Sequence, residues 1–263
     1  MHQTTYHKAS SAEDAAAKLG SAEDGMILAG GQTLLPTMKQ RLAAPSDLVD
    51  LSGAGLSGIS VDGNTLTIGA MTTHAEVASS ADVQRVIPSL ACLAAGIGDP
   101  AVRNRGTIGG SVANNDPAAD YPAAMLGLGA TIVTNSREIV AEDFFTGMFS
   151  TDLEEGEVIT SVKVTAPERS AYAKFPNPAS RYAMAGVFVA KSAGGVRVAV
   201  TGAGDDGVFR HEGLETALAS DFSAGAVDAV PVSADSMLHD IHGDGAYRAQ
   251  LVKVMAKRAV EAA

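Results

Sequence analysis

The chain has 263 residues, a net charge of −11 and a single cysteine, and 46% of its residues are apolar. This length can form a full hydrophobic core and predicts two domains. The negative charge argues against nonspecific binding of nucleic acid, and one thiol excludes both a disulfide framework and a four-cysteine iron–sulfur centre within the chain. We expect a cytoplasmic protein without a transmembrane segment, because MHQTTYHK lacks an apolar signal core and no stretch is apolar over the roughly eighteen residues that a membrane span needs.

The first fifty residues predict a small βαβ-like unit. Residues 11–20 combine a serine N-cap, early acidic residues and a terminal glycine, which is typical of a short helix. Met26–Ala29 predicts a strand, and Pro36 can occupy the first turn of a helix that runs through Leu42. Residues 48–52 predict the strand that closes the unit.

The turn between that strand and that helix carries the glycine pair Gly30–Gly31, followed by Gln32 and Thr33. A buried strand that ends in a tight glycine turn and leads into a helix is the usual setting for a phosphate near a helix N-terminus. A plain surface turn is the alternative. This loop alone does not decide between the two.

The next stretch predicts short strands and then helices. Residues 58–69 have the pattern of a β-hairpin, with Asp-Gly-Asn at its turn. Thr73 and Glu76 have the spacing of a capping box, so we interpret His74 as a residue of a helix N-terminus rather than as a catalytic base. Residues 83–97 predict two helical pieces separated at Pro88, with Cys92 as a buried apolar side chain.

A second glycine loop lies within residues 103–122, RNRGTIGGSVANNDPAADYP, where three glycines fall within five residues. Successive exposed backbone N–H groups form a concavity that suits an anion such as a pyrophosphate. The following amides and carboxylates, Asn114, Asn115, Asp116 and Asp120, suit a ligand rich in hydroxyl groups. Together, the two loops predict a clasp around one diphosphate.

The rest of the chain predicts a mixed region and then an antiparallel domain. Residues 123–133 run from helix to strand, residues 157–164 alternate as a strand, and a domain boundary is expected near Pro167. Residues 186–201 predict a hairpin around a Gly-Gly turn, and a helix with one apolar face follows from Gln250.

Gly202–Gly207 matches the dinucleotide pattern G-x-G-x-x-G, but we interpret it as a turn. The strand before it is one arm of the expected hairpin, so no parallel βαβ unit is set up. Asp205 and Asp206 would also place negative charge where a pyrophosphate should lie.

Four segments carry a resemblance to a known family: AGGQTLLPTMK, MTTHAEVASS, DPAVRNRGTIGGSVANNDPAADYPAA and DIHGDGAYR. In this order they resemble the FAD-binding medium subunits of molybdenum hydroxylases, in the xanthine dehydrogenase family and nearest to the carbon monoxide dehydrogenase type. The resemblance covers nearly the whole chain. It implies an α+β fold with a PCMH-type FAD-binding domain at residues 1–166 and a smaller C-terminal domain of antiparallel sheet and helices at residues 167–263.

The resemblance also implies FAD as the cofactor, with the diphosphate between backbone amides of residues 29–33 and 107–111. Asp120 would hold ribityl or ribose hydroxyls, Ile159 would contact the flavin edge, and Lys174 would lie near the flavin carbonyl oxygens. A solvated strand residue is the alternative for Lys174, and a helix N-cap for Asp120. The expected FAD-binding residues are Leu28, Ala29, Gly30, Gly31, Gln32, Thr33, Leu34, Thr107, Ile108, Gly109, Gly110, Ser111, Ala113, Asn114, Asp120, Ile159 and Lys174.

By the same resemblance the partners are a large molybdopterin subunit and a small subunit with two [2Fe–2S] clusters, in a dimer of heterotrimers. The chain would carry electrons through FAD to an external acceptor, and no catalytic side chains are expected in it. A self-contained PCMH-type flavin oxidoreductase and a scaffold protein that has lost FAD are the alternatives. The substrate, the acceptor (NAD or a quinone) and any role of Arg181 and Tyr182 stay open.

Overall fold

The computed structural model describes residues 2–263 and begins with a small α/β unit. Its three strands are all parallel, in the order β1-β3-β2. Ser11 caps the first helix through Asp14 N, as the sequence predicts. The elements are β1 (Thr5–Lys8), α1 (Ala12–Gly20), β2 (Gly25–Leu28), α2 (Leu34–Lys39), β3 (Asp47–Asp50) and a 3-10 turn, η1 (Leu51–Gly53).

The central unit is a five-stranded antiparallel sheet with helices packed on it, in the strand order β4-β5-β10-β6-β7. The expected hairpin, the Thr73–Glu76 capping box and the helix break at Pro88 are all confirmed. The elements are β4 (Ile59–Asp62), β5 (Thr65–Gly69), α3 (His74–Ser79), α4 (Ala81–Val86), α5 (Pro88–Ala95), α6 (Pro100–Arg103), α7 (Ile108–Asn114), α8 (Asp120–Leu128), β6 (Thr131–Thr134), β7 (Glu138–Val140), α9 (Ala141–Phe144), β8 (Phe145–Gly147), β9 (Ser150–Thr151) and β10 (Ile159–Thr165).

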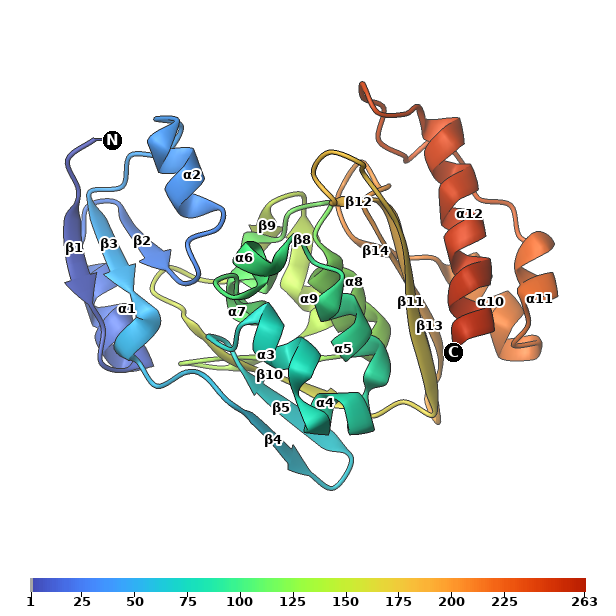
Figure 1. Cartoon of the computed structure of the whole chain (residues 1–263), viewed down its shortest axis with the longest axis horizontal. Helices are drawn as coiled ribbons and strands as arrows, with labels where there is room; N and C mark the ends of the chain where they lie inside the picture. Colours follow the sequence, from blue (N-terminus) through green and yellow to red (C-terminus); the bar gives the residue numbers. More distant parts are fainter. Residues whose placement is uncertain (1) are drawn as a thin grey trace.

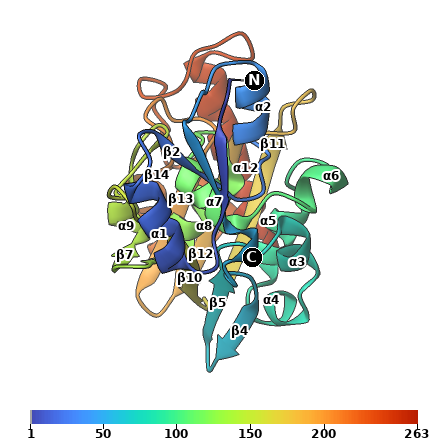
Figure 2. The same cartoon turned by 90° about the vertical axis from the view of Figure 1, so that its left-hand side faces the viewer.

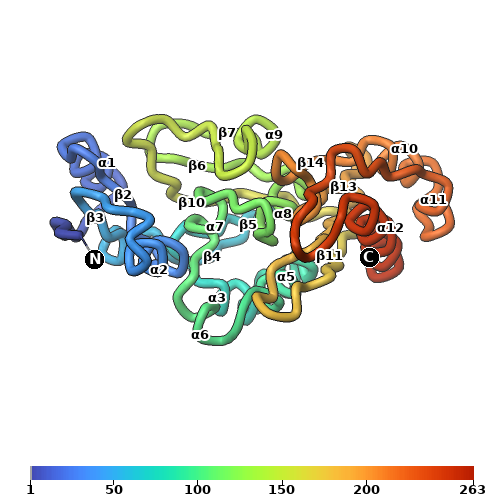
Figure 3. The backbone as a smooth tube through the Cα atoms, turned by 90° about the horizontal axis from the view of Figure 1, so that it is seen from above, coloured from blue at the N-terminus to red at the C-terminus, as the bar shows by residue number. Residues whose placement is uncertain are grey.

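The C-terminal part is a four-stranded antiparallel sheet, in the order β11-β12-β13-β14, between two groups of helices. In Figure 1 its strands stand between the central helices and α12, and Figure 3 shows the three parts of the chain in a row. The predicted hairpin is confirmed by the pairing of β12 with β13. The elements are β11 (Arg169–Pro176), β12 (Ala183–Ser192), β13 (Gly195–Thr201), β14 (Phe209–Arg210), α10 (Glu212–Ser220), α11 (Ala224–Asp228) and α12 (Gly245–Ala262).

The central strand β12 explains why the sheet of the C-terminal part is covered on both faces. Its first eight residues are all buried, and neighbouring side chains alternate between two cores. Phe188 packs in the core of the central unit, whereas Val187 and Val189 pack in the C-terminal core with α12. The two parts therefore share a strand surface across the expected boundary at 166/167, and that boundary stays a prediction.

Three local features differ from expectation. Strand β1 was not predicted, because its TYHK sequence has no apolar alternation and is largely exposed at the sheet edge. Helix α2 ends at Lys39 rather than running to Leu42. Cys92 is exposed, not buried, because the face of α5 that packs inward carries Leu90, Ala91, Leu93 and Ala94 instead. Within residues 2–263 no helix has the length and apolar character needed to span a bilayer.

Candidate functional site

The main cavity, of about 650 Å³, lies where the N-terminal unit, the central unit and the turn before β12 meet. Figure 2, which looks from the N-terminal side, shows α7 behind β2 and β3. Most of the expected FAD-binding residues line this one space. They are Ala29, Gly30, Gly31, Gln32, Thr33, Leu34, Thr107, Gly109, Gly110, Ser111, Ala113, Asn114, Asp120 and Ile159.

Three expected residues do not line the cavity. Leu28 is the last residue of β2, and Ile108 is buried in the central core at the start of α7. Lys174, on β11, points its Nζ at Asp120 and at the Gly96 carbonyl. Contacts of these three residues with a ligand stay a prediction.

The first glycine loop presents backbone donors. The N–H groups of Gly30, Gly31, Gln32, Thr33 and Leu34 have no acceptor within residues 2–263, and all five residues line the cavity. Gly31 makes this possible, because its φ of 72° lies in the left-handed region that other residues avoid. Thr33 precedes α2 without a side-chain capping bond, and its hydroxyl has no other partner within residues 2–263. A run of adjacent unpaired N–H groups is a binding site for an anion.

The second glycine loop differs, because its amides bond within the protein. Ile108 N donates to Thr72 O (3.1 Å), Gly109 N to Ala70 O (2.9 Å), and Gly110 N to Thr107 Oγ1 (3.1 Å). Ser111 N donates to Thr107 O (3.1 Å). These four amides are bonded, contrary to the expectation of successive exposed donors, whereas Thr107 N has no acceptor within residues 2–263. Two side chains of α7 also face the cavity, the Ser111 hydroxyl and the Asn114 amide, and neither has a partner within residues 2–263.

The glycines themselves bring the two loops together. A Cβ on Gly30 would lie 2.1 Å from Arg105 O, and one on Gly109 would lie 2.5 Å from the Ala70 Cβ. A Cβ on Gly110 would meet Thr107 Oγ1 at 2.9 Å and the Ala29 Cβ at 3.4 Å. The backbones approach so closely that no side chain fits between them.

A buried ion pair supports the far end of the cavity. Lys174 Nζ lies 3.0 Å from Asp120 Oδ2, with only 11% and 6% of the two side chains exposed, and the Tyr172 hydroxyl donates to the same carboxylate. Burial raises the pKa of Asp120, against the lowering by Lys174 and Tyr172. The interpretation of Lys174 as a solvated residue is therefore wrong. Asp120 is not an N-cap either, because Ala119 holds that position in α8.

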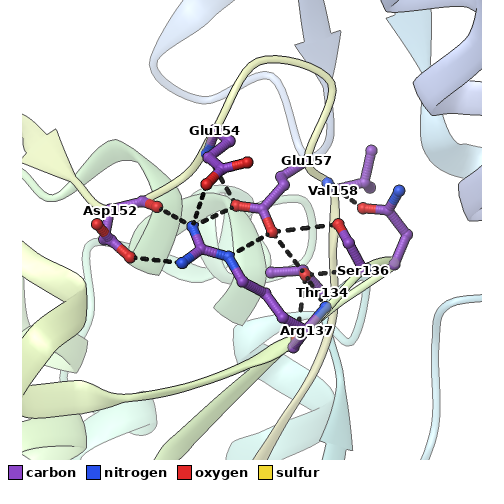
Figure 4. A network of polar contacts seen from close by, with 8 residues as sticks. Thr134, Ser136, Arg137, Asp152, Glu154, Glu157 and Val158 are labelled. Carbon is purple, nitrogen blue, oxygen red and sulfur yellow. Dashed lines mark hydrogen bonds and ion pairs between the residues drawn. The ribbon is translucent and has the colours of Figure 1, made fainter.

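The wall formed by residues 152–159 rests on a polar network that the sequence did not reveal (Figure 4). Glu157 accepts bonds from Arg137 Nε and Nη2, both at 2.9 Å, and Arg137 Nη1 binds Asp152 Oδ2. The Arg137 guanidinium lowers the pKa of Glu157 to about 2. Glu157, Val158 and Ile159 then line the cavity. Arg137 and Glu157 meet only in the folded chain, so no local sequence pattern predicts this ion pair.

His74 also lines the cavity and is buried at the start of α3. Burial, with Arg103 nearby, lowers its pKa to about 4, so the ring is neutral near pH 7. A group of this basicity is a poor general base, in agreement with the interpretation as a helix residue.

The G-x-G-x-x-G segment is a turn, as interpreted from the sequence. It connects β13 to the antiparallel β14, and Gly202 N donates to Pro117 O. The turn of residues 180–182, by contrast, lines the cavity with Arg181 and Tyr182. No role for Arg181 or Tyr182 could be predicted from the sequence.

The residues present fit a dinucleotide cofactor: a run of amides without an acceptor within residues 2–263 for phosphate oxygens, side-chain hydrogen-bonding groups on α7, and a cavity of about 650 Å³ that Tyr182 and Ile159 also line. Binding of a dinucleotide requires hydrogen-bond donors for its phosphate oxygens, and the amides of the first loop provide such donors.

Comparisons with known proteins agree. Residues 2–167 match the family described as the FAD binding domain in molybdopterin dehydrogenase. The chain is 37% identical to the carbon monoxide dehydrogenase medium chain of Hydrogenophaga pseudoflava, covering 98% of this chain and 96% of that one. It is 36% identical to the nicotine 6-hydroxylase medium subunit of Paenarthrobacter nicotinovorans, covering 97% and 95%.

Among solved structures, the chain is similar to one of reconstituted CO dehydrogenase from Oligotropha carboxidovorans. The TM-score is 0.91 at 34% identity, with 99% of this chain and 97% of that chain covered. The α+β fold and FAD as the cofactor, both expected from the sequence, are confirmed. The chain belongs to the FAD-binding medium subunits of the molybdenum hydroxylases, an oxidoreductase family, and is of the carbon monoxide dehydrogenase type.

Proposed function

We propose that this chain is the electron-transfer subunit of a heteromeric molybdenum hydroxylase, and that it delivers electrons from a partner's [2Fe–2S] clusters to an external acceptor. The bound FAD supplies the redox chemistry, since it takes up electrons and passes them on. The observation that carries the proposal is the run of backbone amides at Gly30–Leu34, which line one cavity and have no acceptor within residues 2–263.

Each part of the cavity has a distinct task in this proposal. The amides of the first loop hold the diphosphate oxygens, and Ser111 and Asn114 add side-chain hydrogen bonds. The carboxylate of Asp120, positioned by Lys174 and Tyr172, accepts from ribityl or ribose hydroxyls with its remaining lone pairs. The Arg137–Glu157 pair keeps Ile159 at the flavin edge.

The partners we propose are a large molybdopterin subunit and a small subunit with two [2Fe–2S] clusters, assembled as a dimer of heterotrimers. Support comes from the similarity to medium subunits along nearly the whole chain. The hydroxylated substrate would bind to the large subunit, so this chain would not contact it.

The test compares the chain alone with the chain coexpressed with its partners. Alone, it should be yellow from bound FAD, contain no stoichiometric iron and fail to oxidise substrate, because its one thiol cannot hold a cluster. Coexpressed, it should copurify with iron and molybdenum and reduce a dye when substrate is added. Dye reduction by the lone chain would indicate a self-contained oxidoreductase instead, and a colourless lone chain would contradict the cofactor site.

A further inference from the structure

Two arginines converge at the rim of the cavity, on the loop after α5. Arg103 Nη1 donates to Ile97 O (2.9 Å) and to Gly98 O (3.1 Å), and Arg181 Nη1 donates to the same Gly98 O (3.1 Å). Gly98 and Arg181 line the cavity. Two guanidinium groups from distant parts of the chain thus share one carbonyl oxygen beside the flavin site.

Neither guanidinium has a carboxylate partner. Within residues 2–263, no Asp or Glu oxygen lies within 4.0 Å of Arg103 or Arg181. The nearest acid in sequence, Asp99, caps α6 through Val102 N instead, and Asp116, which also lines the cavity, accepts from Ala118 N. In a chain with a net charge of −11, two adjacent unpaired cations are unexpected, because an acidic partner would relieve their repulsion.

The backbone around Arg181 is built to place this side chain. Arg181 has a φ of 66°, a left-handed conformation that a non-glycine residue adopts only when its surroundings impose it. The surroundings are a turn held by the buried Asn177: its side-chain oxygen accepts from Ala179 N and Ser180 N, and Arg181 N donates to Asn177 O. These bonds use only Nη1 of each guanidinium group, and the other N–H donors of both groups have no partner within residues 2–263.

From this geometry we infer that Arg103 and Arg181 form a binding subsite for an anionic electron acceptor, placed at the mouth of the FAD cavity. Phosphate, carboxylate or sulfonate oxygens are the groups that paired guanidinium donors recognise. The inference rests on the proposed function, and it goes further by assigning a charge to the acceptor and two residues to its binding.

The test is a stopped-flow measurement on the full chain with bound FAD, reduced anaerobically with dithionite. Ferricyanide is the anionic acceptor: two ions take one electron each from one reduced FAD, and two protons are released. Neutral 1,4-benzoquinone takes both electrons and both protons and becomes hydroquinone. We compare R181E with R258E, which changes the net charge equally at an exposed arginine of α12 away from the cavity, and we include R181K, which keeps the charge.

At low ionic strength, R181E should lower the ferricyanide rate constant about tenfold, and added salt should reduce the difference. R258E should stay near wild type, and R181K should lie between wild type and R181E, because it keeps the charge but loses the guanidinium donors. The benzoquinone rate should not change in any variant. NAD⁺ added before mixing should compete with ferricyanide in wild type if a dinucleotide is the natural acceptor, whereas a small anionic acceptor predicts no competition.

Three outcomes overturn the inference: equal loss of both acceptors, an unchanged ferricyanide rate in R181E, or loss of FAD from R181E. Loss of FAD would mean that the arginines hold the phosphates of the cofactor itself. Failure of the proposed function looks different, since wild type would then lack FAD or transfer electrons to neither acceptor.

Discussion

The two glycine loops border the same cavity in opposite ways. Among the residues that the structure describes, the five consecutive backbone amides of Gly30–Leu34 have no acceptor, whereas the amides of residues 108–111 are bonded to Ala70, Thr72 and Thr107. The first loop therefore offers open donors to the cavity, whereas the second is closely packed against its neighbours. Binding of a ligand by the first loop stays a prediction, which the variants below test.

The largest expected effect is that of Gly109→Ala, which should lower the stability of the folded protein. The added Cβ would lie 2.5 Å from the Ala70 Cβ and 2.8 Å from Ala70 O, both in a packed core. Such overpacking costs roughly 1–3 kcal/mol in the free energy of unfolding. Gly20→Ala is the control, because nothing lies within 4 Å of a Cβ there. Urea unfolding measures the effect, and an unchanged midpoint for Gly109→Ala would contradict the close packing of the second loop against Ala70.

Gly31→Ala should act on the cofactor instead. Its φ of 72° costs an alanine roughly 1–2 kcal/mol, which favours a loop whose amides no longer face the anion. We expect FAD to bind about tenfold more weakly, as measured by titration of the apoprotein. Gly63→Ala is the control for backbone strain alone (φ 56°), at the turn between β4 and β5 and with nothing within 4 Å of its Cβ; at Gly31 the added Cβ would also meet Leu35 Cδ1 at 2.8 Å, which displaces the loop further. Equal loss of FAD in both variants would contradict a specific role of the first loop.

Two threonines at corresponding positions of the two loops allow a second test, with smaller expected effects on stability and on FAD binding. Thr107 caps α7 by accepting from Gly110 N, so Thr107→Ala should lose about 1 kcal/mol of stability. Thr33 makes no such bond, so Thr33→Ala should leave the melting temperature unchanged. Its free hydroxyl lines the cavity, and its loss should weaken FAD by roughly twofold to tenfold. Thermal melts and FAD titration of both variants test this prediction. Lower stability of Thr33→Ala together with weaker FAD binding by Thr107→Ala would contradict it.

The last prediction concerns the pH dependence of the cavity wall at residues 152–159, which the Arg137–Glu157 ion pair holds. Because Arg137 lowers the pKa of Glu157 from 4.5 to about 2, the ionised carboxylate stabilises the folded state above pH 4.5. That stabilisation is lost as the pH falls from about 4.5 to about 2. The difference in unfolding free energy between wild type and Glu157→Gln should therefore narrow over this range. A difference that is constant with pH would show that the pair does not titrate as inferred.

Much of the local structure could be predicted from the sequence, because local chemistry decides it. Ser11, the Thr73–Glu76 box and Pro88 each determine a helix end through groups within four residues of one another. The two glycine loops were recognised for the same reason. Most of the expected FAD-binding residues line one cavity, although their individual contacts with FAD stay a prediction.

Tertiary structure alone decided which donors are open and which charges are paired. Whether an amide is free depends on a carbonyl such as Ala70 O, more than thirty residues away in the chain from Gly109 N. The pairs Lys174–Asp120 and Arg137–Glu157, and the meeting of Arg103 with Arg181, likewise join residues from separate elements. Hydrogen bonds and ion pairs act over a few ångströms in space, whatever the distance along the chain. The sequence alone determined the helix ends, the glycine turns and the family; the packing of three units determined what each loop offers a ligand.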